Sequence, residues 1–139
     1  MPDAQVFADI HQLLADFFGC VDGNHLGGAA ECFAPDGTWH RMGTDLTGRE
    51  AILAALNERP ADRITLHLFS NLRLLDHDAD SATYTYGLIV HVTRTEDGSP
   101  RPGTMTMSVM KGRDTATRTE DGWHFARREA NLIYRVDVG

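Results

Sequence analysis

The sequence predicts an α+β fold in which three N-terminal helices pack on a curved, mainly antiparallel sheet. Before Pro60, apolar residues recur at the spacing of three and four that is typical of amphipathic helices. After Arg63, four long runs rich in β-branched and aromatic residues alternate with short polar breaks, as in strands joined by hairpins. The 139 residues contain no linker or internal repeat, so we expect one domain over residues 1–139.

Two helices are expected at the start of the chain. The first has about four turns and ends near Gly19. Its apolar positions are Val6, Ile10, Leu13, Leu14 and Phe17. After a break at residues 22–24, a short second helix carries Leu26, Ala29, Ala30 and Phe33 on its apolar face. Residues 35–37, Pro-Asp-Gly, are expected to end this helix because proline and glycine disfavour its continuation.

A short strand over residues 38–42 and a third helix are expected next. Thr47 and Glu50 have the spacing of a capping box, in which the threonine hydroxyl accepts from a helical amide and the glutamate reaches back. The helix continues from Ala51 to Glu58, and Pro60 ends it.

Four long strands follow, and their turn-forming breaks predict hairpins. The strands are expected over residues 64–75, 81–95, 104–113 or a little beyond, and 123–136. The breaks are the polar residues 76–80, 96–100 and 120–122. A strongly twisted sheet of this length can curl around helices and leave a cavity at one end, which is where we expect a ligand.

Charge and composition limit the function classes. The net charge is −7, and the arginines are scattered along a chain with one lysine, so we expect no nucleic-acid partner. No run is long enough to cross a bilayer and no secretory signal is visible, so we expect no membrane partner. Cys20 and Cys32 fit no metal or redox spacing, and we expect free thiols in a reducing cytoplasm.

Asp22 and His67 are the candidate catalytic pair. His67 lies on a predicted strand that alternates with an apolar face, and Asp22 follows the first helix. If the two meet, the carboxylate orients the imidazole as a general base for removing a proton from carbon. Alternatively, Asp22 caps the second helix, because Asp-Gly-Asn is common cap chemistry. The two roles exclude each other, since a capping carboxylate points at backbone amides.

Other residues are assigned to the walls of the same cavity. His91, one strand later, is a candidate acid that assists a leaving group if it shares the cavity with His67. Trp39, Phe69, Asn71 and Ile89 are the candidate substrate-binding residues, because a few polar groups among apolar ones fix a ligand's orientation.

The motifs of cofactor and metal chemistry are missing from the sequence. No pair of histidines has a zinc-ligand spacing with a third ligand, and no glycine-rich nucleotide-binding loop is present. We therefore expect neither a metal nor a cofactor.

Several landmarks together resemble the SnoaL-like branch of the nuclear transport factor 2-like superfamily. They are residues 34–39 (Ala-Pro-Asp-Gly-Thr-Trp), 48–52 (Gly-Arg-Glu-Ala-Ile), His67 with Asn71, 79–84 (Ala-Asp-Ser-Ala-Thr-Tyr) and 121–123 (Asp-Gly-Trp). The resemblance implies a cone-shaped, cystatin-like roll. The chain is most similar in function to lyases of the scytalone dehydratase and hexachlorocyclohexane dehydrochlorinase type, which use an Asp–His pair at the places of Asp22 and His67 and no cofactor.

The resemblance implies a cofactor-independent lyase, a dehydratase or a related β-elimination enzyme, acting on a small, largely apolar molecule. An isomerase or polyketide-cyclase-type enzyme would use the same base, and the sequence does not separate the two. A third possibility is a non-catalytic ligand-binding or assembly module that associates through outer strand residues such as Tyr84, Tyr86, Met105 and Met107. A homodimer or higher homo-oligomer is the default expectation for such a sheet.

Overall fold

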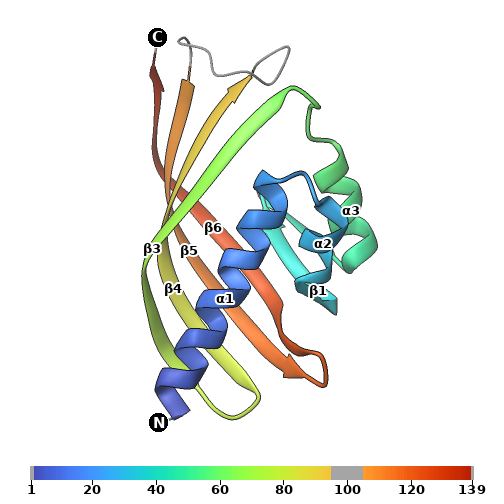
Figure 1. Cartoon of the computed structure of the whole chain (residues 1–139), viewed down its shortest axis with the longest axis vertical. Coiled ribbons are helices and arrows are strands. Elements are labelled where there is room, and N and C mark those ends of the chain that lie inside the picture. Colours follow the sequence, from blue (N-terminus) through green and yellow to red (C-terminus); the bar gives the residue numbers. More distant parts are fainter. Residues whose placement is uncertain (1, 95–104, 139) are drawn as a thin grey trace.

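The computed structural model describes residues 2–94 and 105–138 (Figure 1). Its three helices are α1 (Pro2–Asp22), α2 (Leu26–Glu31) and α3 (Arg49–Asn57). Its strands are β1 (Phe33–Arg41), β2 (Thr44–Thr47), β3 (Arg63–His77), β4 (Ser81–Arg94), β5 (Met105–Thr119) and β6 (Gly122–Val138). The α+β class is therefore confirmed.

The six strands form one sheet in the order β2-β1-β6-β5-β4-β3. Only β1 and β6 pair in parallel among the described strands, so the sheet is mainly antiparallel, as expected. The four long strands and the hairpin turns at residues 76–80 and 120–122 are confirmed to within a few residues. The expected turn at residues 96–100 lies outside the described residues.

The prediction for the segment between α2 and α3 is wrong in two respects. Phe33 begins β1 instead of ending a helix, and residues 35–37 lie within that strand. The register with β6 shifts between Phe33 and Thr38, which accommodates the proline and glycine as an irregularity of the strand. A Cβ at Gly37 would lie 2.7 Å from the Phe125 carbonyl oxygen, so only glycine allows β6 this close. Strand β2 was not predicted.

The predicted capping box is also wrong. The residue that precedes α3 is Gly48, with a φ of 92°, and no side chain caps the helix. Thr47 is instead the last residue of β2, and its hydroxyl lies 3.1 Å from that of Thr38 on β1. The Thr47 hydroxyl therefore interacts across β1 and β2 and is not available to cap α3.

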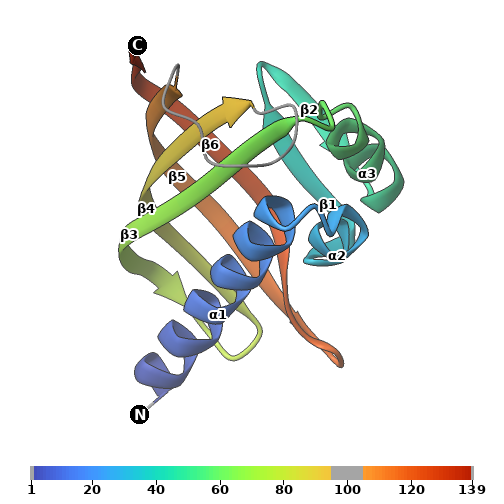
Figure 2. The ribbon, with the colours of Figure 1, turned by 45° about the horizontal axis from the view of Figure 1, so that its top comes forward.

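Helix α1 lies across one face of the sheet, while α2 and α3 lie beside β1 (Figures 1 and 2). The core between α1 and the sheet includes the fully buried side chains of Ile10, Leu14, Tyr84 and Phe125. Tyr84 and Tyr86 lie with Ala82 and Leu88 on the buried face of β4, so their assignment to an exposed assembly surface is wrong.

Candidate active site

Asp22 is the last residue of α1, and its carboxylate does not cap the next helix. The residue that precedes α2 is His25, and no side chain bonds to the amides of its first turn. The alternative prediction for Asp22 as a helix cap is therefore wrong. Because α1 continues to Asp22, three residues beyond the predicted end at Gly19, its carboxylate reaches β3.

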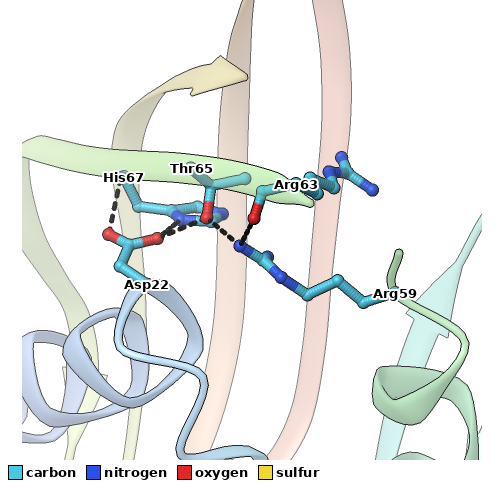
Figure 3. Close-up of polar contacts among 5 residues, drawn as sticks. All are labelled: Asp22, Arg59, Arg63, Thr65 and His67. Carbon is cyan, nitrogen blue, oxygen red and sulfur yellow. Dashed lines mark hydrogen bonds and ion pairs between the residues drawn. The ribbon is translucent and has the colours of Figure 1, made fainter. Parts of the chain in front are cut away.

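Asp22 and His67 contact each other directly. Nδ1 of His67 lies 2.6 Å from Oδ1 of Asp22, and the backbone amide of His67 donates to Oδ2 at 2.9 Å (Figure 3). Since an ionised carboxylate only accepts hydrogen bonds, Nδ1 carries a proton and Nε2 is left as the basic nitrogen. The two hydrogen bonds to Asp22 fix the orientation of the His67 ring and hold its strand, β3, against the end of α1.

A second hydrogen-bond chain supports the Asp22 carboxylate from the other side. The hydroxyl of Thr65 donates to Oδ1 of Asp22 at 2.8 Å. The Nη2 atom of Arg59 donates to this hydroxyl at 2.8 Å and to the Arg63 carbonyl at 3.4 Å (Figure 3). The strand pleat places Thr65 and His67 on the same face of β3, so both reach Asp22.

The protonation of Asp22 is set by two opposing effects. Burial disfavours its charged form, but the hydrogen bonds from the side chain and backbone of His67 and from Thr65 hold the pKa of Asp22 below its ordinary value of 3.8. Asp22 is therefore ionised at neutral pH. An ionised carboxylate against Nδ1 stabilises the imidazolium that forms when His67 takes up a proton.

Phe18 fixes the plane of the imidazole. Its ring stacks on that of His67, with centroids 5.1 Å apart and planes 12° apart. The ring of Phe18 also contacts the rings of Phe17, its neighbour in α1, and of Phe69 on β3. The imidazole thus has a hydrogen bond at one edge and an aromatic ring on one face.

His67 opens into a cavity of about 550 Å³. Its apolar lining includes Phe17, Trp39, Leu88, Val90 and Met110. Trp39 lies in the wall, where the sequence predicted it. A cavity of this size suits a small organic molecule.

Four of the predicted site residues lie elsewhere. His91 pairs with Leu66 across the two strands, whereas Val90 pairs with His67 and lines the cavity. Because successive strand side chains point to opposite faces, His91 and Ile89 point away from the cavity, and their predicted roles there are wrong.

Phe69 and Asn71 do not line the cavity either, among the described residues. Phe69 packs between Phe18 and His11 beneath α1. Asn71 is exposed with a φ of 55° at an irregularity in the pairing of β3 with β4. Asn71 allows β3 to bend at this point, since asparagine adopts this left-handed conformation more readily than most residues.

Arg128 also lines the cavity, although a surface position was the favoured expectation for it from the sequence. It is 4% exposed, and its Nε lies 3.4 Å from Oδ2 of the fully buried Asp114. Its Nη2 donates to the hydroxyl of Tyr86, which donates to Asp114 at 3.2 Å. Burial opposes the charge of Arg128, but Asp114 outweighs this and raises the pKa of the guanidinium.

Aromatic rings surround the Arg128 guanidinium, whose carbon lies 4.4 Å from the ring centre of Phe17 and 4.6 Å from that of Phe125. Its Nη1 is buried without a hydrogen-bond partner. Phe125 and Arg128 both point inward, although they are three residues apart, because the pairing of β5 with β6 shifts between Thr115 and Ala116. Regular alternation from Phe125 would have placed Arg127 inside and Arg128 on the surface.

Within residues 2–94 and 105–138, no group of three or more His, Cys, Asp or Glu side chains is placed to hold a metal ion. No helix in the same residues is long and apolar enough to cross a membrane.

The fold has many relatives among solved structures. Hexachlorocyclohexane dehydrochlorinase (LinA) type 2 superposes with a TM-score of 0.82 and 20% identity, over 99% of this chain and 91% of that one. A scytalone-dehydratase-like protein from Novosphingobium aromaticivorans gives a TM-score of 0.84 and 22% identity, over 100% and 93%. At these identities the likeness shows the fold.

A protein from Catenulispora acidiphila is more similar in sequence, with 28% identity, a TM-score of 0.79 and 94% of both chains covered. A comparison with curated protein sequences gives no significant match. The profile of the SnoaL-like domain matches residues 3–129, which is most of the chain. The chain therefore belongs to the SnoaL-like domain family, as its sequence landmarks predicted.

Proposed function

We propose that this protein is a cofactor-independent lyase that catalyses a β-elimination from a small, largely apolar molecule, with Asp22 and His67 as its general base. The observation that carries the proposal is the 2.6 Å contact between Nδ1 of His67 and Asp22 at the wall of the cavity. General-base catalysis contributes about a hundred- to ten-thousand-fold in rate, and positioning in the cavity supplies the remainder.

In the proposed step, Nε2 of His67 takes a proton from a carbon next to an electron-withdrawing group. The electron pair of that C–H bond forms a C=C bond to the neighbouring carbon, from which the leaving group departs with the electrons of its own bond. Asp22 stabilises the imidazolium that results. When the leaving group is hydroxide, the imidazolium returns its proton to it and water is released.

Arg128 supports negative charge in this step. Its Nη1 is buried and unpartnered at the cavity wall, so it donates to an oxygen or halide on which charge develops. The pair with Asp114 and the aromatic rings hold the guanidinium in place before the substrate arrives. This role replaces the one predicted for His91.

The names of the structural relatives support the type of reaction. A dehydrochlorinase removes hydrogen chloride and a dehydratase removes water, and both are eliminations that begin with loss of a proton. An isomerase or cyclase would share the proton-abstraction step, but an acceptor of leaving-group charge such as Arg128 favours elimination.

The first test is proton abstraction itself, measured as exchange of the α-hydrogens of a small β-hydroxy ketone in D₂O, alongside chloride release from hexachlorocyclohexane and formation of an enone. We expect exchange and elimination in the wild type, and loss of both in His67→Asn. His91→Gln is the matched control, since that imidazole faces away from the cavity. Exchange that survives His67→Asn would contradict the proposed base.

A further inference from the structure

The cavity concentrates positive charge in an acidic protein. Five arginines line it, namely Arg41, Arg59, Arg63, Arg128 and Arg135, and no aspartate or glutamate does so among the described residues. The whole chain has 13 basic and 20 acidic residues and a net charge of −7. The fold thus brings together at one site five arginines that are scattered in the sequence.

Two of these five charges have partners. Arg128 pairs with the buried Asp114, and Arg135 lies 3.5 Å from Asp137 on the surface. For the other three, Arg41, Arg59 and Arg63, no carboxylate lies within ion-pair distance in residues 2–94 and 105–138. We call these three residues the arginine cluster.

The arginine cluster is half-buried, and the carboxylates that act on it from a distance, Glu58 on Arg41 and Asp22 on Arg59, form no direct ion pair with it. The Nε atoms of Arg59 and Arg63 are buried without a hydrogen-bond partner. Burial and the nearby charge of Arg63 lower the pKa of both Arg41 and Arg59, and outweigh the opposing effects of Glu58 and Asp22. Like charges in a partly desolvated site repel one another unless an anion is placed among them.

The position of the cluster suits one end of a bound molecule. Met42, which also lines the cavity beside Arg41, is 92% exposed, so this side opens to solvent. The guanidinium of Arg41 lies over the Trp39 ring at 4.9 Å, which fixes its plane at the cavity wall. Apolar residues such as Leu88 and Val90 line the cavity near His67.

We propose that Arg41, Arg59 and Arg63 bind an oxyanion, a carboxylate or phosphate ester, carried by the molecule whose apolar body enters the cavity. This deepens the proposed function, because it names an anionic substrate class for the elimination. The anion lies at the open side of the cavity, away from the reacting carbon, so its binding energy positions the substrate against His67. Arginine presents a planar fork of donors that matches the oxygens of both groups.

Binding of matched probes tests this inference without turnover. Benzoate and phenyl phosphate are compared with neutral benzamide by calorimetry. We expect the better anion to bind roughly tenfold more tightly than benzamide, and we expect added salt to reduce this advantage. Tighter binding of benzoate would indicate a carboxylate site, and tighter binding of phenyl phosphate would indicate a phosphate site.

The variants separate the arginine cluster from general charge and from catalysis. In Arg63→Gln and Arg41→Gln the preference for the anion is expected to disappear, while Arg41→Lys retains part of it. Arg118→Gln is the matched control, because Arg118 is an exposed arginine at the far end of β5. In His67→Asn the preference should remain, so a failed base would leave this result intact. Equal binding of benzoate and benzamide by the wild type, or an equal loss in Arg118→Gln, would overturn the proposal.

Discussion

The carboxylate of Asp22 accepts from both the side chain and the backbone of His67, a residue 45 positions further along the chain. This pairing defines which imidazole nitrogen is basic. It also ties the C-terminal end of α1 to β3, so one carboxylate serves both the proposed chemistry and the fold.

Replacing Asp22 by asparagine should lower kcat about a hundredfold or more, because the amide removes the charge that stabilises the imidazolium. Substrate binding should change little, since Asp22 lies behind His67 and does not line the cavity. The measurement is steady-state kinetics on the elimination substrate. Asp9→Asn, on α1 and outside the cavity, makes the same chemical change and should leave kcat unaltered.

The hydroxyl of Thr65 should contribute more than its methyl group to both stability and kcat. Thr65 is 6% exposed and joins Arg59 to Asp22, so Thr65→Val removes one hydrogen bond from each of these two partly buried groups. We expect a loss of about 1–3 kcal/mol in the free energy of unfolding. Thr65→Ser should recover most of this loss and the wild-type kcat. Urea unfolding of both variants, with kinetics alongside, distinguishes the hydroxyl from packing.

The dependence of stability on pH should show the contribution of Asp22. Its pKa lies below 3.8 in the folded protein, so the unfolded chain takes up a proton first as the pH falls. The contribution is complete above about pH 5 and is lost as the pH falls through the folded pKa. The difference in Tm between the wild type and Asp22→Asn should therefore narrow between about pH 5 and pH 3. A constant difference over that range would contradict the lowered pKa.

Breaking the buried pair of Arg128 and Asp114 should destabilise the protein strongly. Arg128→Met leaves an unpaired carboxylate that is fully buried, at a cost of about 3–5 kcal/mol. The double variant Arg128→Met with Asp114→Leu should be more stable than either single variant, because no charge remains buried. A double-mutant cycle by urea unfolding measures this coupling, and additive losses would argue against it.

Two glycines should respond to alanine in opposite directions. A Cβ at Gly112 would overlap the ring of Tyr86, so Gly112→Ala should cost about 1–3 kcal/mol. At Gly19, within α1, nothing lies within 4 Å of such a Cβ, and Gly19→Ala should gain about 0.5–1 kcal/mol. Thermal unfolding compares the two. Because Tyr86 bonds to Arg128, only Gly112→Ala should also weaken catalysis.

The sequence was most informative where structure depends on local pattern. The long strands and two of their turns follow from alternation and turn residues, and the end of α3 follows from Pro60. The contact of Asp22 with His67 was reached through the resemblance, because nothing local brings together residues so far apart.

The errors lie where register decides the outcome. His91 on β4 pairs with Leu66 on β3 and not with His67. The register between two strands cannot be read from the sequence of either strand alone. The same holds for Phe33, whose apolar side chain fits a helix pattern but pairs with Phe125 on β6. The arginine cluster likewise comes from segments that only the folded sheet brings together.

The one-residue shift in the pairing of β5 with β6, between Thr115 and Ala116, determines which arginine of β6 lies inside the protein. Arg127 and Arg128 are neighbours of the same chemical type, yet one is on the surface and the other is enclosed by aromatic rings. If β6 paired with β5 without this shift, regular alternation from Phe125 would place Arg127 inside and Arg128 on the surface. The register of β6 is therefore as much a determinant of the charge in the cavity as any side chain within it.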